Sequence, residues 1–236
     1  MKTHHGMLKR ITKLGLILML GASMSACGNS TSWKEEVLLH DGQKIIVERY
    51  VNRGGRSEIG QKPPAKEQSV TFTHPITNDR ITWKSEFSKD VGMANFKPLL
   101  LDIFQGTAYM VTSPVGCLSY NKWGRPNPPY VVFKYQSKEW KRIAIQELPA
   151  EIKTPNLIIS SPDTNVELLG KSFVKAEDVQ KINSSLTQPE YRSILREGLA
   201  KERINEMCEE RVQYKGHWIL PNDPIARRFI DQQQKK

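Results

Sequence analysis

The side chains best suited to chemistry, histidine and cysteine, are few and widely spaced in this chain. Beyond residue 26 the histidines are His40, His74 and His217, and none has a Cys or another His at the spacing of a metal site. Sequence patterns for a nucleophilic serine, a zinc hydrolase or a phosphate-binding loop are absent. We therefore expect no metal, no cofactor and no catalytic residue.

Residues 1–26 have the layout of an export signal. Residues 1–13 carry the basic residues Lys2, Lys9, Arg10 and Lys13 and no acid, and residues 14–26 are apolar or small. A basic segment, a short apolar segment and small residues before a cleavage point characterise a secretory signal. The uncharged run is shorter than the roughly 20 residues of a membrane span. We therefore predict a signal peptide over residues 1–26.

The end of this segment, Ser25-Ala26-Cys27-Gly28, resembles the lipobox of bacterial lipoproteins. In that family a peptidase cuts before a cysteine whose thiol carries diacylglycerol, so the resemblance implies a lipidated, palmitate-bearing Cys27. The family prefers Leu three residues before the cysteine, where this chain has the similarly apolar Met24. In that family an Asp directly after the cysteine favours retention at the inner membrane. This chain has Gly28 at that position, so the resemblance implies an outer-membrane anchor facing the periplasm. An ordinary signal peptide with an incidental cysteine is the alternative.

The two remaining cysteines, Cys117 and Cys208, are expected to form a disulfide. Export places the chain in an oxidising compartment, and with Cys27 lipidated only one intramolecular pairing is left. Cys117 lies in a Gly- and Pro-rich segment, and Cys208 shares an apolar helical spacing with Ile204, Met207 and Val212. The bridge would join the C-terminal helices to the β part. Two buried free thiols are the alternative.

Composition indicates a globular protein with a basic surface. The mean hydropathy of −0.52 excludes a polytopic membrane protein, and five Trp, seven Phe and seven Tyr are enough to form a core. After removal of residues 1–26, 31 basic and 25 acidic residues leave a net charge of +6. We expect the membrane as a partner through the lipid, and an acidic glycan, lipid or envelope protein as further partners. No nucleic-acid motif accompanies the charge, so no nucleic acid is expected.

The first part of the mature chain has the pattern of antiparallel hairpins. Short β-rich runs flank turn signals such as Asp41-Gly42 and Gln105-Gly106. The predicted pairs are Trp33–Leu39 with Lys44–Val51, Ser69–His74 with Arg80–Phe87, Pro98–Phe104 with Thr107–Thr112, and Tyr130–Gln136 with Trp140–Ile145. Asn156–Ile159 is predicted as a further short strand. The fold class is therefore mainly β, a sandwich, barrel or partial propeller.

The pattern changes to helical spacing after residue 170. Apolar residues recur at helical intervals in three groups, Val179, Ile182 and Leu186, then Tyr191, Ile194, Leu195 and Leu199, then Ile204, Met207, Cys208 and Val212. We predict a tether over 27–32, a β domain over 33–160, and a helical C-terminal segment over 161–236 packed on it.

The segment Ser113–Pro129 is the best sequence candidate for a binding surface. It places Tyr120, Lys122, Trp123 and Arg125 among Gly, Asn and Pro residues. Aromatic and basic side chains on a stiff loop can stack on sugars or contact an acidic protein. In the alternative, the Trp and Tyr side chains turn back onto the core.

The stretches WKEEVLLHDGQKIIVER (33–49) and YVVFKYQSKEWKRIAIQELP (130–149) resemble those of uncharacterised proteobacterial lipoproteins. The resemblance covers most of the mature chain and implies a location, but no activity, ligand or site residue. The sequence therefore predicts an envelope lipoprotein with a binding or scaffolding role and no catalysis. The alternative is an envelope hydrolase whose site is assembled from scattered carboxylates or histidines.

Overall fold

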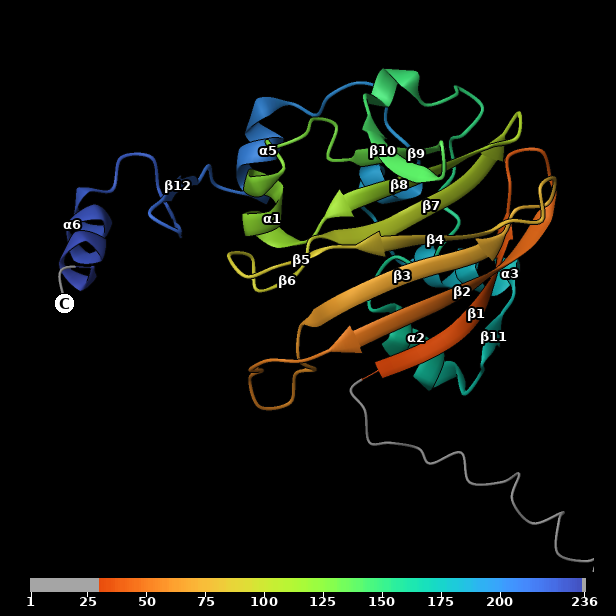
Figure 1. Cartoon of the computed structure of the whole chain (residues 1–236), viewed down its shortest axis with the longest axis horizontal. Coiled ribbons are helices and arrows are strands. Elements are labelled where there is room, and N and C mark those ends of the chain that lie inside the picture. Colours follow the sequence, from red (N-terminus) through yellow and green to blue (C-terminus); the bar gives the residue numbers. More distant parts are fainter. Residues whose placement is uncertain (1–29, 235–236) are drawn as a thin grey trace, which may run out of the picture.

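The computed structural model describes residues 30–234, and the predicted signal peptide and Cys27 lie outside them. The fold is mainly β, as the sequence predicts, with two large antiparallel sheets and no closed barrel (Figure 1). All four predicted hairpins are present within these sheets.

The first sheet contains the two N-terminal hairpins. Its antiparallel strands are β1 (Ser30–Leu38), β2 (Lys44–Arg53), β3 (Ala65–Thr73) and β4 (Arg80–Ser85). A short strand from much later in the chain, β11 (Phe173–Val174), pairs with β1 in parallel at the edge. Residues 30–32 belong to β1, because Ser30 already pairs with Asn52, so the prediction of a tether up to residue 32 is wrong at that end.

The second sheet contains the other two hairpins. Its strands are β7 (Phe96–Phe104), β8 (Thr107–Pro114), β9 (Val131–Gln136) and β10 (Glu139–Ile143), in the order β10-β9-β8-β7. A small pair, β5 (Phe87–Ser88) with β6 (Met93–Ala94), lies in the connection between the sheets. The connection between the sheets runs over residues 86–95, and buried side chains of both sheets pack in one cluster, so the two sheets form a sandwich.

The main core lies between the two sheets. Inward side chains of the first sheet meet inward side chains of the second in one buried cluster, whose largest members include Phe72, Trp83, Phe96, Leu101 and Met110. Alternation along each strand places polar residues on the outer face of the first sheet, where Thr71 and Thr82 hydrogen-bond to each other. This alternation explains why the hairpins could be predicted from sequence.

The segment 156–159 is buried but is not the strand that the sequence predicts. Its backbone N–H groups do not form a strand ladder: those of Asn156 and Leu157 both donate to Leu99 O, whereas Ile158 N donates to the Glu35 carboxylate and Ile159 N to Asn183 Oδ1. The Asn156 side chain bonds the backbone of Leu101 and donates to Leu38 O, so it joins the two sheets. The sequence shows only that this run is apolar. It does not show whether the backbone of the run will hydrogen-bond to a neighbouring strand or to side chains.

The C-terminal part covers the faces that the sandwich leaves open. Helices α2 (Pro162–Leu169) and α3 (Ala176–Asn183) pack with Trp33 and Val51 on the inner face of the first sheet. The outer face of the second sheet packs against Leu148, Ile152 and Ile194. This part also contains the short strand β11, so the predicted helical segment over 161–236 includes strand pairing with the first sheet.

Three further helices and a hairpin complete the chain. They are α4 (Pro189–Arg192), α5 (Lys201–Met207) and α6 (Pro224–Gln233), with β12 (Val212–Tyr214) paired to β13 (His217–Ile219). The hairpin and α6 extend from the body as an arm (Figure 1), which we call the C-terminal arm, residues 212–234. A short 3-10 turn, Ile145–Glu147, follows β10.

Candidate functional site

The predicted binding loop is not an exposed loop in the structure. Residues Gly116–Lys122 form helix α1, and its buried side places Tyr120 at 5% exposure against Ile204 and Cys208. The Trp123 ring packs on Phe96, with ring centroids 4.5 Å apart. The alternative therefore holds for the aromatic residues, which turn back onto the core because a helix gives this segment an inward face.

The two basic residues of that segment are held by other side chains. Lys122 Nζ lies 2.7 Å from Asp90 Oδ1. The Arg125 guanidinium lies over the Tyr120 ring and donates to the side chains of Asn121 and Asn205. The four predicted residues therefore do not form one exposed aromatic and basic surface.

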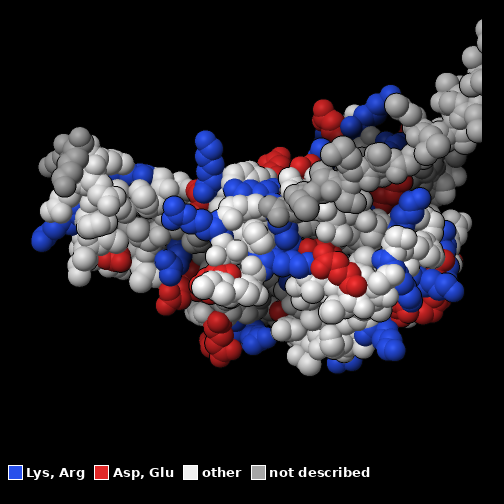
Figure 2. Space-filling model, turned by 90° about the horizontal axis from the view of Figure 1, so that it is seen from below, with Lys and Arg blue, Asp and Glu red and all other residues white. Residues whose placement is uncertain are grey.

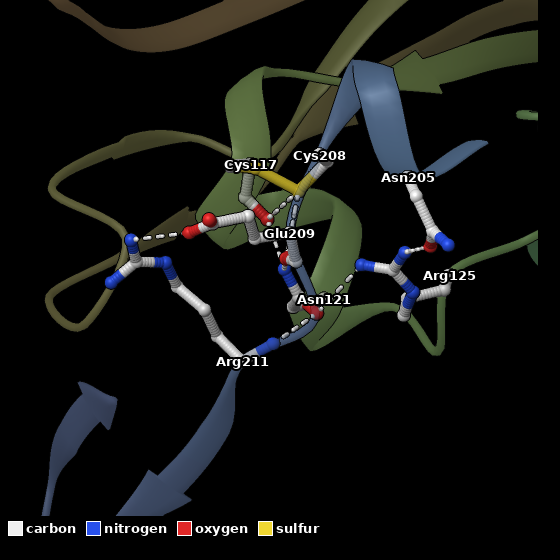
Figure 3. Close-up of a disulfide and its surroundings, with 7 residues drawn as sticks. All are labelled: Cys117, Asn121, Arg125, Asn205, Cys208, Glu209 and Arg211. Atoms are coloured by element: carbon white, nitrogen blue, oxygen red, sulfur yellow. Dashed lines mark hydrogen bonds and ion pairs between the residues drawn. A yellow bond between two sulfur atoms is a disulfide. The ribbon is translucent and has the colours of Figure 1, made fainter. Parts of the chain in front are cut away.

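The predicted disulfide between Cys117 and Cys208 is present (Figure 3). The two Cα atoms are 5.3 Å apart, within the range that a bridge requires. The bridge links α1 to the residue that follows α5. Helix α5 ends at Met207, so Val212 belongs to β12 and does not share a helical face with Cys208.

Asn121 fixes the surroundings of the disulfide, as Figure 3 shows. Its Nδ2 donates to Cys117 O at 3.0 Å and to Glu209 O at 2.9 Å. Its Oδ1 accepts from Arg211 N at 2.8 Å. One amide side chain therefore satisfies backbone groups on both sides of the bridge, and the two segments are held together by polar contacts as well as by sulfur.

A cavity of about 270 Å³ lies beside the disulfide, and we call it the disulfide cavity. Its walls come from three places in the sequence. The α1 side includes Tyr120, the α4 side includes Glu190 and Tyr191, and the α5 side includes Arg203 and Met207. Because Cys117 and Cys208 also line it, the bridge sets the distance between the α1 and α5 walls.

Two lining residues carry buried oxygen atoms without hydrogen-bond partners in the described part of the chain. Glu190 is 2% exposed and its Oε2 is unpartnered, and Gln188 Oε1 is also buried and unpartnered. Buried polar atoms are nearly always hydrogen-bonded, because burial without a partner costs free energy. Glu190 is kept in place through its backbone, since Tyr130 Oη donates to Glu190 O at 2.8 Å.

A histidine and a carboxylate meet elsewhere, at the end of the first hairpin. His40 Nδ1 lies 2.7 Å from Asp102 Oδ1, and Asp102 also accepts from the backbone N–H groups of His40 and Ile103. Burial raises the pKa of Asp102, although the hydrogen bonds from His40 oppose the shift. The cavity beside this pair has no Ser, Thr or Cys in its lining. The pair therefore orients the His40 imidazole, but the lining of that cavity offers no Ser, Thr or Cys side chain that the imidazole could activate as a nucleophile.

Surface charge is mixed rather than gathered. On the face in Figure 2, Lys and Arg side chains are interspersed with Asp and Glu. Ion pairs on the surface of the protein include Lys62 with Glu167 and Lys44 with Glu36. On this face the basic and acidic side chains do not form separate patches.

Sequence reasoning missed the walls that α4 and α5 contribute to the disulfide cavity. Glu190 follows a helix-starting Pro189, a place where an acid is usually exposed, so its type and position gave no signal. Met207 was placed on the face of Cys208, but not as the wall of a cavity. Two sequence signals pointed to this region: the cysteine pairing, and the predicted binding segment Ser113–Pro129, whose Tyr120 lines the cavity.

Within residues 30–234 no helix is long and apolar enough to cross a membrane, and no group of three His, Cys, Asp or Glu could hold a metal ion. Comparisons with family models, with curated proteins and with solved structures found no match to the chain. The residues and geometry of this chain are therefore the basis for assigning it a role.

Proposed function

We propose that this protein is a lipid-anchored envelope lipoprotein that binds a small ligand in the disulfide cavity. The observation that carries the binding role is the cavity of about 270 Å³ itself, whose walls the Cys117–Cys208 bridge holds together. An apolar cavity with a few convergent polar groups is the usual form of a ligand site.

Two features support the envelope location. The basic and apolar segments of residues 1–26 end at a cysteine in a lipobox-like setting. The Cys117–Cys208 disulfide fits an oxidising compartment, since such bridges persist after export and are rare in the cytosol. The anchor at Cys27 would keep the cavity in the periplasm.

The chemistry of the lining favours binding over hydrolysis. The disulfide cavity contains one serine, Ser113, but neither histidine nor lysine among its lining residues. A serine nucleophile needs an adjacent base that a third group orients. The His40–Asp102 pair supplies an oriented imidazole at another place, beside a lining without a hydroxyl or thiol of Ser, Thr or Cys.

A fragment screen on the mature chain with Cys27→Ser tests the binding role. We expect some fragments to raise the melting temperature, because they bind the folded state alone. Met207→Trp, which fills the cavity, should abolish those shifts. Leu168→Trp is the matched control, since Leu168 is 82% exposed on α2 and does not line the cavity. If no fragment raises the melting temperature, or if Met207→Trp keeps every shift, the cavity is not a binding site.

A further inference from the structure

We propose that the C-terminal arm lies on an anionic phospholipid surface through the outward face of α6. This inference rests on the lipid anchor of the proposed function, because the anchor would hold the arm beside a membrane. It assigns an occupant to an apolar face that the rest of the described chain leaves uncovered.

Helix α6 exposes two large apolar side chains on one face. Ile225 is 81% exposed and Phe229 is 59% exposed, and residues four positions apart lie one above the other on a helix. Leu220, in the turn before the helix, is exposed as well. Ile230 is buried, so α6 already has a packed side, and Ile225 with Phe229 forms a second apolar side that nothing within residues 30–234 covers.

The charges of this segment are divided between its two sides. Asp231 is the one acid in the sequence of residues 224–236, and it accepts from Tyr214 Oη at 2.9 Å and pairs with Lys215 at 2.8 Å, so it faces the β12–β13 hairpin. Arg228 is exposed and makes no ion pair in the described part of the chain. Four basic residues against one acid give this stretch a net charge of +3. Large apolar residues beside basic ones are typical of a helix in a membrane interface.

The arm leaves the body at the end of the sandwich that is joined to the anchor. Ser30, at the start of β1, pairs with Asn52 near the end of β2, so β1 and β3 begin and β2 and β4 end on the same side of the first sheet. Strand β4 leads into the β5–β6 turn, where Asp90 accepts from Gln213 and Trp218 of the arm. Figure 1 shows the start of β1 and the β5–β6 turn toward the left-hand end of the sandwich, with the arm beyond them.

A lipid on Cys27 would keep this end of the protein close to the membrane. Three residues of extended chain span at most about 10 Å, so the start of β1 lies within that distance of a lipidated Cys27. At the same end, the loop between β2 and β3 carries the fully exposed Ile59 and the exposed Arg56. A lipid surface suits α6 better than a second copy does, because a symmetric contact between two such faces would bring like charges together.

Co-sedimentation with vesicles tests this surface without the anchor. We would use the mature chain with Cys27→Ser, and vesicles of phosphatidylcholine alone or mixed equally with phosphatidylglycerol. The chain should bind the anionic vesicles at least about tenfold more tightly, and added salt should reduce the difference because it screens the charges. Arg228→Gln should weaken binding to the anionic vesicles about fivefold, since it removes one basic side chain from the contact.

Ile225→Ser with Phe229→Ser is the decisive variant. Both side chains are exposed in the free protein, so the melting temperature should change little, whereas binding to the anionic vesicles should fall by at least about tenfold. Ile46→Ser with Ile76→Ser is the matched control and should bind as the unsubstituted chain does. Ile46 and Ile76 are also exposed, and they lie near the β1–β2 and β3–β4 turns, at the opposite end of the first sheet.

Hydrogen exchange measures the same contact in the anchored protein. The mature chain with its native Cys27 would be coupled through that thiol to a maleimide lipid in the anionic vesicles, because Cys117 and Cys208 are bridged. The backbone amides of α6 should then exchange several-fold more slowly than in the free chain. The Ile225→Ser, Phe229→Ser variant should show no such slowing.

Several results would overturn the membrane contact of α6. They are equal binding to both kinds of vesicle, unchanged binding by the Ile225→Ser, Phe229→Ser variant, or no vesicle binding by the free chain together with no slowing of exchange in the coupled chain. Self-association that the same variant abolishes would assign the face to a second copy and would also overturn it.

The proposed function is tested by other measurements. Palmitate incorporation at Cys27 tests the anchor, and the fragment screen tests the disulfide cavity. A chain that binds anionic vesicles through α6 but carries no palmitate would refute the anchor and keep the membrane contact. A palmitate-bearing chain whose α6 amides exchange equally fast when free and when coupled, and whose Cys27→Ser form does not bind vesicles, would refute the membrane contact and keep the anchor.

Discussion

A buried ion pair joins Glu35 on β1 to Arg49 on β2. Glu35 is fully buried and Arg49 is 2% exposed. Arg49 NH1 lies 3.0 Å from both carboxylate oxygens, and Trp33 Nε1 and Ile158 N also donate to that carboxylate. The pair sits on the inner face of the first sheet, between the main core and the cluster under α2 and α3. The Glu35 carboxylate therefore accepts hydrogen bonds from donors on β1, on β2 and on the segment that contains Ile158.

Removing one member of this pair should cost far more than removing both charges. Arg49→Met leaves the buried carboxylate without a cation, and we expect a loss of about 3–5 kcal/mol in the free energy of unfolding. Glu35→Gln together with Arg49→Met should restore much of it, because the amide stays neutral and can still accept from Trp33. Urea unfolding measures both. Arg80→Met, which removes an exposed partner of Glu48, is the control and should change little. A double variant no more stable than Arg49→Met would contradict the explanation.

Asp163 gives the stability of the protein a defined pH dependence. Burial alone would raise its pKa, but the hydrogen bonds from Arg53 at 2.7 and 2.8 Å, together with the positive charges of Arg53 and Lys62, hold the pKa below the ordinary 3.8. The unfolded chain therefore takes up this proton at higher pH than the folded chain. The contribution of ionised Asp163 to the free energy of unfolding is therefore complete above about pH 5 and is lost as the pH falls below about 4.

Asp163→Asn should therefore destabilise the protein at neutral pH and matter less in acid. We expect a loss of about 1–3 kcal/mol at pH 7, measured by urea unfolding, and a smaller difference from the wild type at pH 3. A difference that does not shrink in acid would mean that Asp163 acts through packing. Asp41→Asn is the control, because Asp41 is exposed and accepts only a local backbone hydrogen bond.

At the scale of elements, the disulfide and the cavity form one unit. The bridge closes a loop across 91 positions and holds α5 against α1. The chain-entropy argument gives about 4 kcal/mol for a loop of this size, so Cys117→Ser with Cys208→Ser should lower stability by about that amount. The same variant should weaken ligand binding, because the α5 wall is no longer fixed.

Thiol labelling checks the pairing directly. The denatured, unreduced mature chain with Cys27→Ser should show no reactive thiol, and the reduced chain should show two. Two reactive thiols before reduction would contradict the bridge. Each single Cys→Ser variant is a useful control, since it should lose nearly as much stability as the double variant.

The elements that could be predicted are those with local signals. The first hairpin was found because Asp41-Gly42 separates two alternating runs, and Gly42 does adopt a positive φ of 86°. The strand β11 was not found, because its two residues gain their partner 139 positions away, where Lys34 pairs with Phe173. Glu190 was not found either, since its burial depends on α1, α4 and α5 meeting at one place. Local sequence pattern is therefore enough to predict hairpins. A site whose residues come from distant segments can be recognised only when the fold is known.

At the scale of the whole molecule, the C-terminal arm is joined to the body by few contacts. Gln213 Nε2 and Trp218 Nε1 donate to Asp90, at 2.9 and 3.2 Å, while α6 packs mainly on its own hairpin through Tyr214. Deleting residues 212–236 should therefore lower the melting temperature by no more than a few degrees, measured by circular dichroism. Deleting residues 201–236 is the contrast and should be severe, because Ile204 and Cys208 go with it. If the two deletions lowered the melting temperature equally, the arm would be part of the packed core.

The anchor is the second prediction at this scale. Expressed in a Gram-negative host, the protein should incorporate labelled palmitate and partition into detergent, because two or three acyl chains hold a protein firmly on a membrane. Cys27→Ser should lose both properties. A serine variant that stays with the membrane after a salt wash would place the anchor elsewhere.

The parallel contact between β11 and β1 has a mechanical consequence. Strand β1 begins three residues after Cys27, so any force on a lipid anchor would enter the fold through β1. Had β1 been an edge strand, such a force could open its hydrogen bonds one at a time. With β2 on one side and β11 on the other, a pull along the strand must shear both sets of bonds together. Trimming β11 should therefore lower the unfolding force in single-molecule pulling from the N-terminus more than it lowers the equilibrium stability.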